Sequence, residues 1–199
     1  MARLILASAS PRRRELLSLL GVTFEVRPAD LDEALQPAEP PREYVSRLAE
    51  EKALALAAGA GDDFILAADT SVVIGDEVLG KPGDDPALGA AMLRRLSGRE
   101  HQVITGVCLC HQRRLRSVLV STDVHVRALS EEEIRWYVAS KEGQDKAGGY
   151  AVQGLGSFAV ARLEGSYANV VGLPACEVVS ALRKLGLLAT FPIAARRPA

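Results

Sequence analysis

The chain has 199 residues, a formal net charge of −1 and a hydrophobic fraction of 48%. This length suits one domain with a packed core, and the balanced charge gives no support to general binding of nucleic acid or membrane surfaces. No segment approaches the roughly 20 consecutive apolar residues of a transmembrane helix. The three cysteines fit neither a disulfide framework nor a zinc site, so we expect a cytoplasmic protein.

The N-terminal segment predicts a strand, a tight turn and a helix. Residues 3–7, RLILA, have the composition of a short buried strand. Ser10 can cap the helix that follows, with Pro11 at its first position and Gly21 at its end. Free backbone N–H groups and the helix dipole both favour an anion at such a junction.

Three consecutive arginines, Arg12, Arg13 and Arg14, follow in the first turn of this helix, where the helix dipole disfavours cations. A bound polyanion would remove that repulsion, because arginine forks suit phosphate oxygens. The hydroxyls of Ser8 and Ser10 add further donors. Successive helical residues are about 100° apart, so the three arginines cannot all face one ligand. We assign Arg14 to solvent; the plainer interpretation of the whole stretch is a solvated basic turn.

The remaining sequence alternates between strand and helix patterns, and hairpin signals interrupt the alternation. This organisation predicts an α/β protein with a mixed sheet. We expect strands at residues 22–29, 64–69, 101–110, 117–126 and 158–165, a hairpin at 71–82 turning at Gly75–Asp76, helices at 41–59, 86–98, 131–140 and 174–186, and a glycine-rich loop at 145–157.

Single polar residues along these elements suggest a site when they are taken together. Lys52 lies in the apolar stripe of the second helix. Asp69 ends an apolar run at the expected carboxyl end of a strand, where sites in open α/β sheets gather. Glu33, Lys81 and Gln153 fall in loops or turns. Each also has a plainer interpretation: a snorkelling lysine, a turn cap, a surface charge or a tight loop.

Together these residues indicate a site for a phosphate chain. The lysines and arginines match phosphate, and the two carboxylates match a Mg²⁺-type ion that bridges phosphates and activates water. No Ser–His or Cys–His pair is evident as a protein nucleophile, so direct attack by water is the simpler chemistry.

Eight motifs, in order along the chain, resemble those of the Maf family of nucleotide pyrophosphatases. They are LASASPRR at 6–13, DLDE at 30–33, LAEEKA at 48–53, AADT at 67–70, LGKP at 79–82, VITGV at 103–107, DKAGGYAVQG at 145–154 and SYANVVGLP at 166–174. The resemblance implies an elongated, two-lobed α/β fold with a mixed β-sheet and flanking helices, shared distantly with inosine triphosphate pyrophosphatases. It also implies a single domain over residues 1–189 with a cleft between the lobes, and we expect the tail at 190–199 to be flexible.

The resemblance further implies hydrolysis of a nucleoside triphosphate to the monophosphate and pyrophosphate with a divalent cation, Mg²⁺ or Mn²⁺. Asp69 matches the family's proposed proton acceptor, and Glu33 and Asp69 would hold the metal, so Asp69 can serve as metal ligand or as general base. The substrate would contact Ser8, Ser10, Arg13, Lys52 and Lys81, and the choice of base would depend on Arg12, Thr70 and Gln153.

Two features resemble the branch of the family that acts on dTTP and UTP. These are Arg12 directly after SP and the loop GGYAVQG at 148–154. A glutamine amide both donates and accepts hydrogen bonds, which suits a pyrimidine edge. The alternatives are the same chemistry on 7-methyl-GTP or inosine nucleotides, or a regulatory binding protein of septum formation. Neither nucleic acid nor a membrane is an expected partner, and a homodimer is the assembly that we consider.

Overall fold

The computed structural model describes residues 2–188, and the tail expected at 190–199 lies outside them. One mixed sheet of seven strands forms the body, in the order β2-β1-β3-β5-β6-β7, with β4 also paired to β3. β1 runs parallel to β2 and β3, and the other pairings are antiparallel. The expected α/β class with a mixed sheet is therefore confirmed. The strands are β1 (Leu4–Leu6), β2 (Glu25–Val26), β3 (Phe64–Ile74), β4 (Glu77–Leu79), β5 (Glu100–His111), β6 (Arg114–Val126) and β7 (Val160–Glu164).

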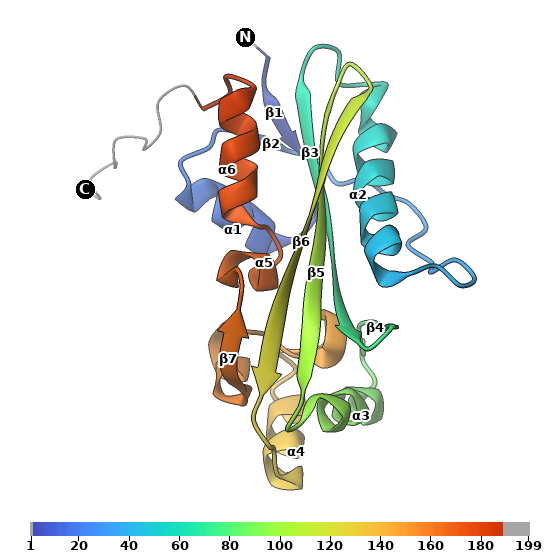
Figure 1. The fold of residues 1–199 in the computed structure, drawn as a ribbon, viewed down its shortest axis with the longest axis vertical. Helices are drawn as coiled ribbons and strands as arrows, with labels where there is room; N and C mark the ends of the chain where they lie inside the picture. Colours follow the sequence, from blue (N-terminus) through green and yellow to red (C-terminus); the bar gives the residue numbers. More distant parts are fainter. Residues whose placement is uncertain (1, 189–199) are drawn as a thin grey trace.

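Helices flank the long strands on both sides and close the lower end of the molecule (Figure 1). α2 lies on one side, α1, α5 and α6 on the other, and α3 and α4 below, and the strands β5 and β6 give the molecule its elongated shape (Figure 1). None of the helices within residues 2–188 has the length and apolar composition needed to cross a bilayer. The helices are α1 (Pro11–Leu19), α2 (Pro41–Ala57), α3 (Pro86–Leu96), α4 (Glu131–Ala139), α5 (Tyr167–Val171) and α6 (Ala175–Lys184), with 3₁₀ turns η1 (Ala147–Gly149) and η2 (Gly154–Ala159).

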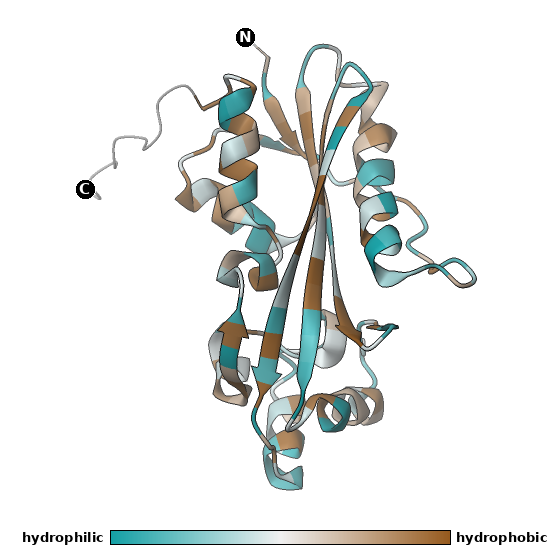
Figure 2. Ribbon diagram, viewed as in Figure 1, coloured by the Kyte–Doolittle hydropathy of each residue, from teal (hydrophilic) through white to brown (hydrophobic). Residues whose placement is uncertain are grey.

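Two large apolar clusters fill the two ends of the molecule, and β3 runs from one to the other. The upper cluster joins β1, α1, β3 and α6, and includes Leu66 and Leu182. The lower cluster joins the far end of β3 to α3 and α4, and includes Val72 and Ile134. Figure 2 shows apolar stretches along the strands and alternating colours along α2 and α6, as expected where one helix face packs inward. The polar residues 69–71 of β3 lie between the two clusters.

The site is created by a gap along one edge of β3. β5 pairs with one edge of β3 from Ile65 to Val73, so β1 and β4 must share the other edge. β1 pairs with residues 64–66 there, and β4 with residues 72–74. Among the strands of residues 2–188, none covers this edge over residues 67–71. Backbone groups and side chains of β3 are therefore open to a cavity at this point.

Gly106 lets α2 lie directly on the sheet beside Asp69. Gly106 is the register partner of Asp69 in β5, so the two residues share a face. A Cβ added at Gly106 would lie 2.4 Å from the carbonyl oxygen of Val45 in α2. Glycine is the one residue that allows this approach, and the approach brings Lys52 of the same helix to Asp69.

Gly106→Ala is expected to lower the free energy of unfolding by about 2 kcal/mol, because its methyl group pushes α2 away from the sheet. The displaced helix also moves Lys52 away from Asp69. Gly59→Ala is the matched control, because a Cβ at Gly59, just after α2, meets no atom within 4 Å. Chemical denaturation of both variants tests this, and equal stabilities would contradict the close approach.

Several local signals act as predicted from the sequence. Ser10 Oγ accepts a hydrogen bond from the Arg13 N–H at the start of α1, and Pro11 begins that helix. The β3–β4 hairpin turns at residues 75–76. The capping box that Ser130 forms with Glu133 begins α4.

Two expectations about local structure were wrong, and one helix was missed. The strand expected at 22–29 is reduced to the two residues of β2. β3 does not end at Asp69 but continues to Ile74, because residues 72–74 are paired with β4 as well as β5. α5 was not expected at all, since a helix of five residues is too short for a periodic pattern; Ser166 caps it.

Candidate active site

A cavity of about 600 Å³ opens at the gap in the edge of β3. It straddles the sheet, because Asp69 contacts α2 on one face while Thr70 contacts Arg13 of α1 on the other. Gln153 does not line it. The other residues that the sequence indicated all do: Ser8, Ser10, Arg12, Arg13, Glu33, Lys52, Asp69, Thr70 and Lys81.

Lys52 joins the two candidate carboxylates. Its Nζ lies 2.7 Å from Asp69 Oδ1 and 2.6 Å from Glu33 Oε1. Both Lys52 and Asp69 are only 7% exposed, so the lysine points into the cavity and does not snorkel to solvent. Asp69 is held by the sheet, whereas Glu33 comes from the loop between β2 and α2.

Glu33 stays ionised in this setting. Partial burial by itself raises the pKa of its carboxyl group, but the hydrogen bond and charge of Lys52, with smaller effects of Lys81 and Arg13, hold that pKa below its ordinary value. The cavity therefore presents an anionic carboxylate at neutral pH, as binding of a cation requires.

Arg13 is committed mainly to the protein itself. Its guanidinium donates to the carbonyl oxygens of Gly172 and Ala68, each at 2.8 Å. It also donates to Ser8 Oγ at 3.2 Å and Thr70 Oγ1 at 3.0 Å. A guanidinium has five N–H donors, so one is left for a ligand. The side chain thus closes the open edge of β3 at Ala68, a role that the expectation of a phosphate ligand had missed.

The three arginines divide as their helical spacing predicted. Arg13 is buried, Arg12 is half-buried and lines the cavity, and Arg14 is exposed. Burial lowers the pKa of Arg13 from its ordinary value, an effect that the charges of Asp69 and Glu33 oppose. Arg12 is therefore the member of the run with most of its donors available to an anion at the start of α1.

The side of the cavity nearest the lower cluster is apolar. Val72, Val103 and Tyr150 of that cluster line it, together with Val152. Tyr150 is fixed by a 2.7 Å hydrogen bond between its hydroxyl and His101 Nε2. Burial lowers the pKa of His101 to about 4, so this imidazole is neutral at physiological pH. The cavity therefore combines a charged side, suited to phosphates, with an apolar side, suited to a flat ring.

The cavity is also lined by residues that were not identified from the sequence, and these include Tyr44, Asp145, Lys146 and Tyr150. Tyr44 lies on the same α2 stripe as Lys52, which is the signal that could have identified it. The other three lie in the glycine-rich loop, where no periodic pattern points toward the cavity.

Comparison with known proteins decides which family has this arrangement. The family model described as "Maf-like protein" matches residues 3–185. The chain belongs to the Maf family.

Its relatives within that family are similar over nearly their full length. The chain is 53% identical to a dTTP/UTP pyrophosphatase of Syntrophus aciditrophicus (strain SB), covering 94% of this chain and 91% of that protein. It is 51% identical to a protein of the same name from Anaeromyxobacter dehalogenans (strain 2CP-1 / ATCC BAA-258), covering 98% of each. The resemblance to the dTTP/UTP branch is therefore confirmed.

A solved structure shares the fold at low sequence identity. The HAM1 protein from Coxiella burnetii superposes with a TM-score of 0.55 and 16% identity, over 93% of this chain and 100% of that one. At this identity the match supports the fold alone.

The metal expected for a Maf protein has a suitable place between Glu33 and Asp69. One oxygen of each carboxylate lies within hydrogen-bonding distance of the same ammonium group of Lys52, so a cation is already accommodated between them. Mg²⁺ is commonly bound through one or two carboxylates, with phosphate oxygens and water completing its shell. The donor set of this Maf chain therefore fits a divalent cation carried with a triphosphate.

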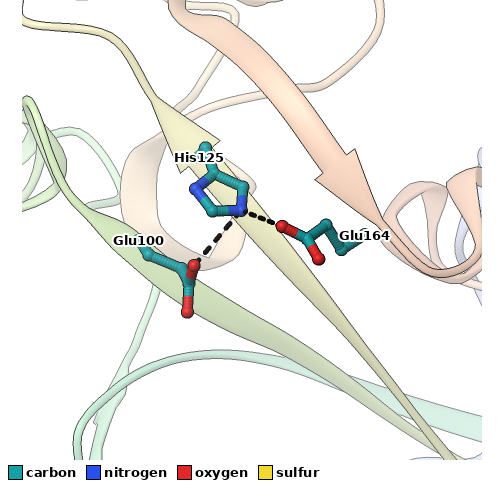
Figure 3. Close-up of side chains that lie close together, drawn as sticks. All are labelled: Glu100, His125 and Glu164. Carbon is teal, nitrogen blue, oxygen red and sulfur yellow. Dashed lines mark hydrogen bonds and ion pairs between the residues drawn. The ribbon is translucent and has the colours of Figure 1, made fainter.

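Within residues 2–188, another group of side chains could hold a metal ion: Glu100, His125 and Glu164, from β5, β6 and β7 (Figure 3). His125 Nε2 lies 3.2 Å from Glu100 Oε2 and 2.9 Å from Glu164 Oε1. Glu164 also pairs with Arg162 at 3.0 Å. None of these side chains lines the cavity, so this group is separate from the Glu33–Lys52–Asp69 site.

Gln153 lies beside the cavity rather than in it. Its neighbour Val152 lines the cavity, and Gln153 itself is half-buried. The loop is fixed by Glu142, which accepts hydrogen bonds from the N–H groups of Leu155 at 2.8 Å and Gly156 at 2.7 Å. The role of Gln153 in the choice of base therefore stays a prediction.

Proposed function

We propose that this Maf protein hydrolyses dTTP and UTP to the nucleoside monophosphate and pyrophosphate by metal-assisted attack of water. The observation that carries the proposal is the Glu33–Lys52–Asp69 group, which lies in the same cavity as the start of α1. A helix start with free N–H groups favours phosphate, and a carboxylate pair favours the cation that accompanies phosphate. The choice of dTTP and UTP as the proposed substrates rests on the names of the relatives.

In this proposal the phosphate chain lies against the start of α1. Ser8 and Ser10 contribute hydroxyl groups, while Arg12 and Lys81 contribute most of the positive charge. Arg13 offers its one remaining donor and keeps Ser8 and Thr70 in place. A divalent cation bound by Glu33 and Asp69 would supply charge neutralisation along the phosphates.

Asp69 is the proposed acceptor of the proton from the attacking water. The water oxygen forms a bond to phosphorus, the bond between the α- and β-phosphates breaks, and pyrophosphate leaves. Lys52 keeps the Asp69 carboxylate oriented before substrate arrives, through the 2.7 Å contact. Positioning and charge stabilisation account for most catalysis of phosphoryl transfer, and this cavity offers both.

The base is proposed to occupy the apolar side of the cavity, near Tyr150. Arg12, Thr70 and Gln153 remain the residues proposed to set the choice of base. Thr70 acts indirectly in this scheme, because its hydroxyl accepts a hydrogen bond from Arg13 and lies 3.0 Å from Thr105 Oγ1. We also expect a cytoplasmic location.

The experiment is pyrophosphate release from dTTP, UTP, ATP, GTP and 7-methyl-GTP with Mg²⁺, each nucleotide assayed separately. We expect dTTP and UTP to be hydrolysed well ahead of the three purine nucleotides, and the methyl group of thymine to matter little. Preference for 7-methyl-GTP would move the protein to another branch of the family. Release from none of the five would favour the regulatory binding protein.

Gln153→Glu is expected to lower kcat/KM for dTTP and UTP by about 5-fold or more, because it removes a donor and adds a negative charge beside the proposed base site. Gln144→Glu is the matched control, since it makes the same chemical change at another half-buried glutamine to which no role in the choice of base is assigned. Kinetics of both variants on the five nucleotides test the role. An unchanged substrate ranking in Gln153→Glu would remove Gln153 from the choice of base.

A further inference from the structure

The loop that carries Glu33 has little to hold it except polar contacts. This segment, residues 27–40, joins β2 to α2 without forming a helix or strand, and we call it the Glu33 loop. None of its residues is buried, and the side chain of Leu35 is 51% exposed. Since no part of the loop is inserted into the core, its position must depend on a few specific hydrogen bonds.

Two side chains of α2 supply those bonds, to the two carbonyl groups that directly follow the Glu33 side chain. The hydroxyl of Tyr44 donates to the carbonyl oxygen of Glu33 at 2.8 Å. The guanidinium of Arg47 donates to the next carbonyl oxygen, that of Ala34, at 3.1 Å.

Arg47 also fixes the far end of the loop. Its fork donates to both carboxylate oxygens of Glu39, at 2.6 and 2.8 Å. Glu39 in turn accepts a hydrogen bond from the Gln36 N–H at 3.1 Å. The Arg47 guanidinium lies over the ring of Tyr44, 5.7 Å from its centroid, so the two side chains form one unit.

This unit affects one carboxylate of the cation site and not the other. Asp69 is held in β3 between paired strands, whereas Glu33 is held by the loop. Loosening the loop would move Glu33 away from the point where its oxygen meets Lys52 and leave Asp69 unchanged. Arg47 does not line the cavity, so any effect of its loss on the cation must pass through the loop.

We propose that Tyr44 and Arg47 are positioning residues that hold the Glu33 loop against α2 and so set the affinity of the cavity for its divalent cation. The inference rests on the proposed function for the identity of the cation site. It adds two residues that the sequence did not indicate, and it assigns them to cation binding rather than to contact with nucleotide.

The test compares Arg47→Met and Tyr44→Phe with the matched controls Arg42→Met, exposed on the same helix, and Tyr167→Phe, 49% exposed on α5. Two quantities are measured for each protein. The first is the Mg²⁺ concentration that gives half-maximal pyrophosphate release from saturating dTTP. The second is hydrogen exchange in peptides covering residues 27–40, without nucleotide, as Mg²⁺ is titrated.

We expect both test variants to need about 3- to 10-fold more Mg²⁺ for half-maximal activity, the effect of one or two lost hydrogen bonds. Their loops should exchange faster and need a similarly higher Mg²⁺ concentration for protection, while both controls match the wild type. A higher Mg²⁺ concentration should restore part of the activity lost in these variants. It would not do so if the variants had lost activity through a general loss of structure. Thermal melting identifies any variant that fails to fold. If Arg47→Met does not fold, Arg47→Lys replaces it, because lysine keeps the positive charge but cannot donate the paired hydrogen bonds of a guanidinium.

Wild-type Mg²⁺ dependence in a folded Arg47 variant overturns the proposal, even if its loop exchanges faster, because the side chains would then be structural only. Failure of the proposed function is recognised separately, from a wild type that releases no pyrophosphate. In that case the exchange titration still decides: an equal Mg²⁺ requirement for loop protection in wild type and variants overturns the inference.

Discussion

Asp69→Asn is expected to lower kcat for dTTP by at least about 10²-fold, the scale of a lost general base. The asparagine has nearly the same shape, but it removes the charge that pairs with Lys52 at 2.7 Å and that would accept a proton from water. The fold should survive, because the backbone of Asp69 remains paired with Gly106 of β5. Steady-state kinetics with a melting curve measure both effects.

Asp76→Asn is the control for this variant, since Asp76 is exposed in the turn of the hairpin that ends β3. The control makes the same chemical change in the turn between β3 and β4, at a residue that does not line the cavity. It should keep the wild-type kcat. A folded Asp69→Asn protein with near wild-type kcat would contradict the mechanism.

Arg13→Ala is expected to lower the free energy of unfolding by about 3 kcal/mol and to reduce activity strongly. The variant leaves the carbonyl oxygens of Ala68 and Gly172 without a donor in a buried setting, and hydrogen bonds to a charged group are worth about 1.5–3 kcal/mol each. Ser8 and Thr70 also lose the group that positions them. Chemical denaturation and dTTP kinetics report the two losses.

Arg14→Ala separates this role from a general effect of charge, because Arg14 is exposed in the same helical turn. Its free energy of unfolding should lie within about 0.5 kcal/mol of the wild-type value. A small increase is expected, because the variant removes an unfavourable interaction between a cation and the helix dipole. If the Arg13→Ala protein is as stable and as active as the Arg14→Ala protein, the hydrogen bonds of Arg13 to Ala68 and Gly172 do not have the stabilising role that we assign to them.

Local sequence signals predicted most helices and turns, because caps and hairpin residues act through their immediate neighbours. Ser10 with Pro11, and Ser130 with Glu133, begin α1 and α4 as expected. Nine of the residues chosen for the site line one cavity. Their convergence was implied by the family resemblance, and the single-residue arguments alone left plainer interpretations open.

The origin of the site was not predictable from local pattern. Asp69 was expected at the end of a strand, but it lies within β3, and the cavity exists because β1 and β4 leave part of one edge uncovered. Which strands share an edge is decided by pairing between distant segments.

The partners of Arg13 were hidden for the same reason. Its guanidinium contacts the carbonyl oxygens of Ala68 and Gly172, which are 55 and 159 residues away in the chain. Sequence reasoning identified a cation suited to phosphate, but it had no means of finding the backbone acceptors that the fold would bring to it. The loop position of Gln153 likewise depends on Glu142, which no sequence pattern connected with it.

The central claim is that water cleaves a pyrimidine triphosphate between its α- and β-phosphates in the cavity beside Asp69. Phosphorus NMR of the products formed from dTTP and Mg²⁺ tests it most directly, with Asp69→Asn as the paired sample. We expect the wild type to form dTMP and pyrophosphate in equal amounts, and Asp69→Asn to form almost none of either in the same time. Formation of dTDP and phosphate, or equal rates in the two proteins, would contradict it.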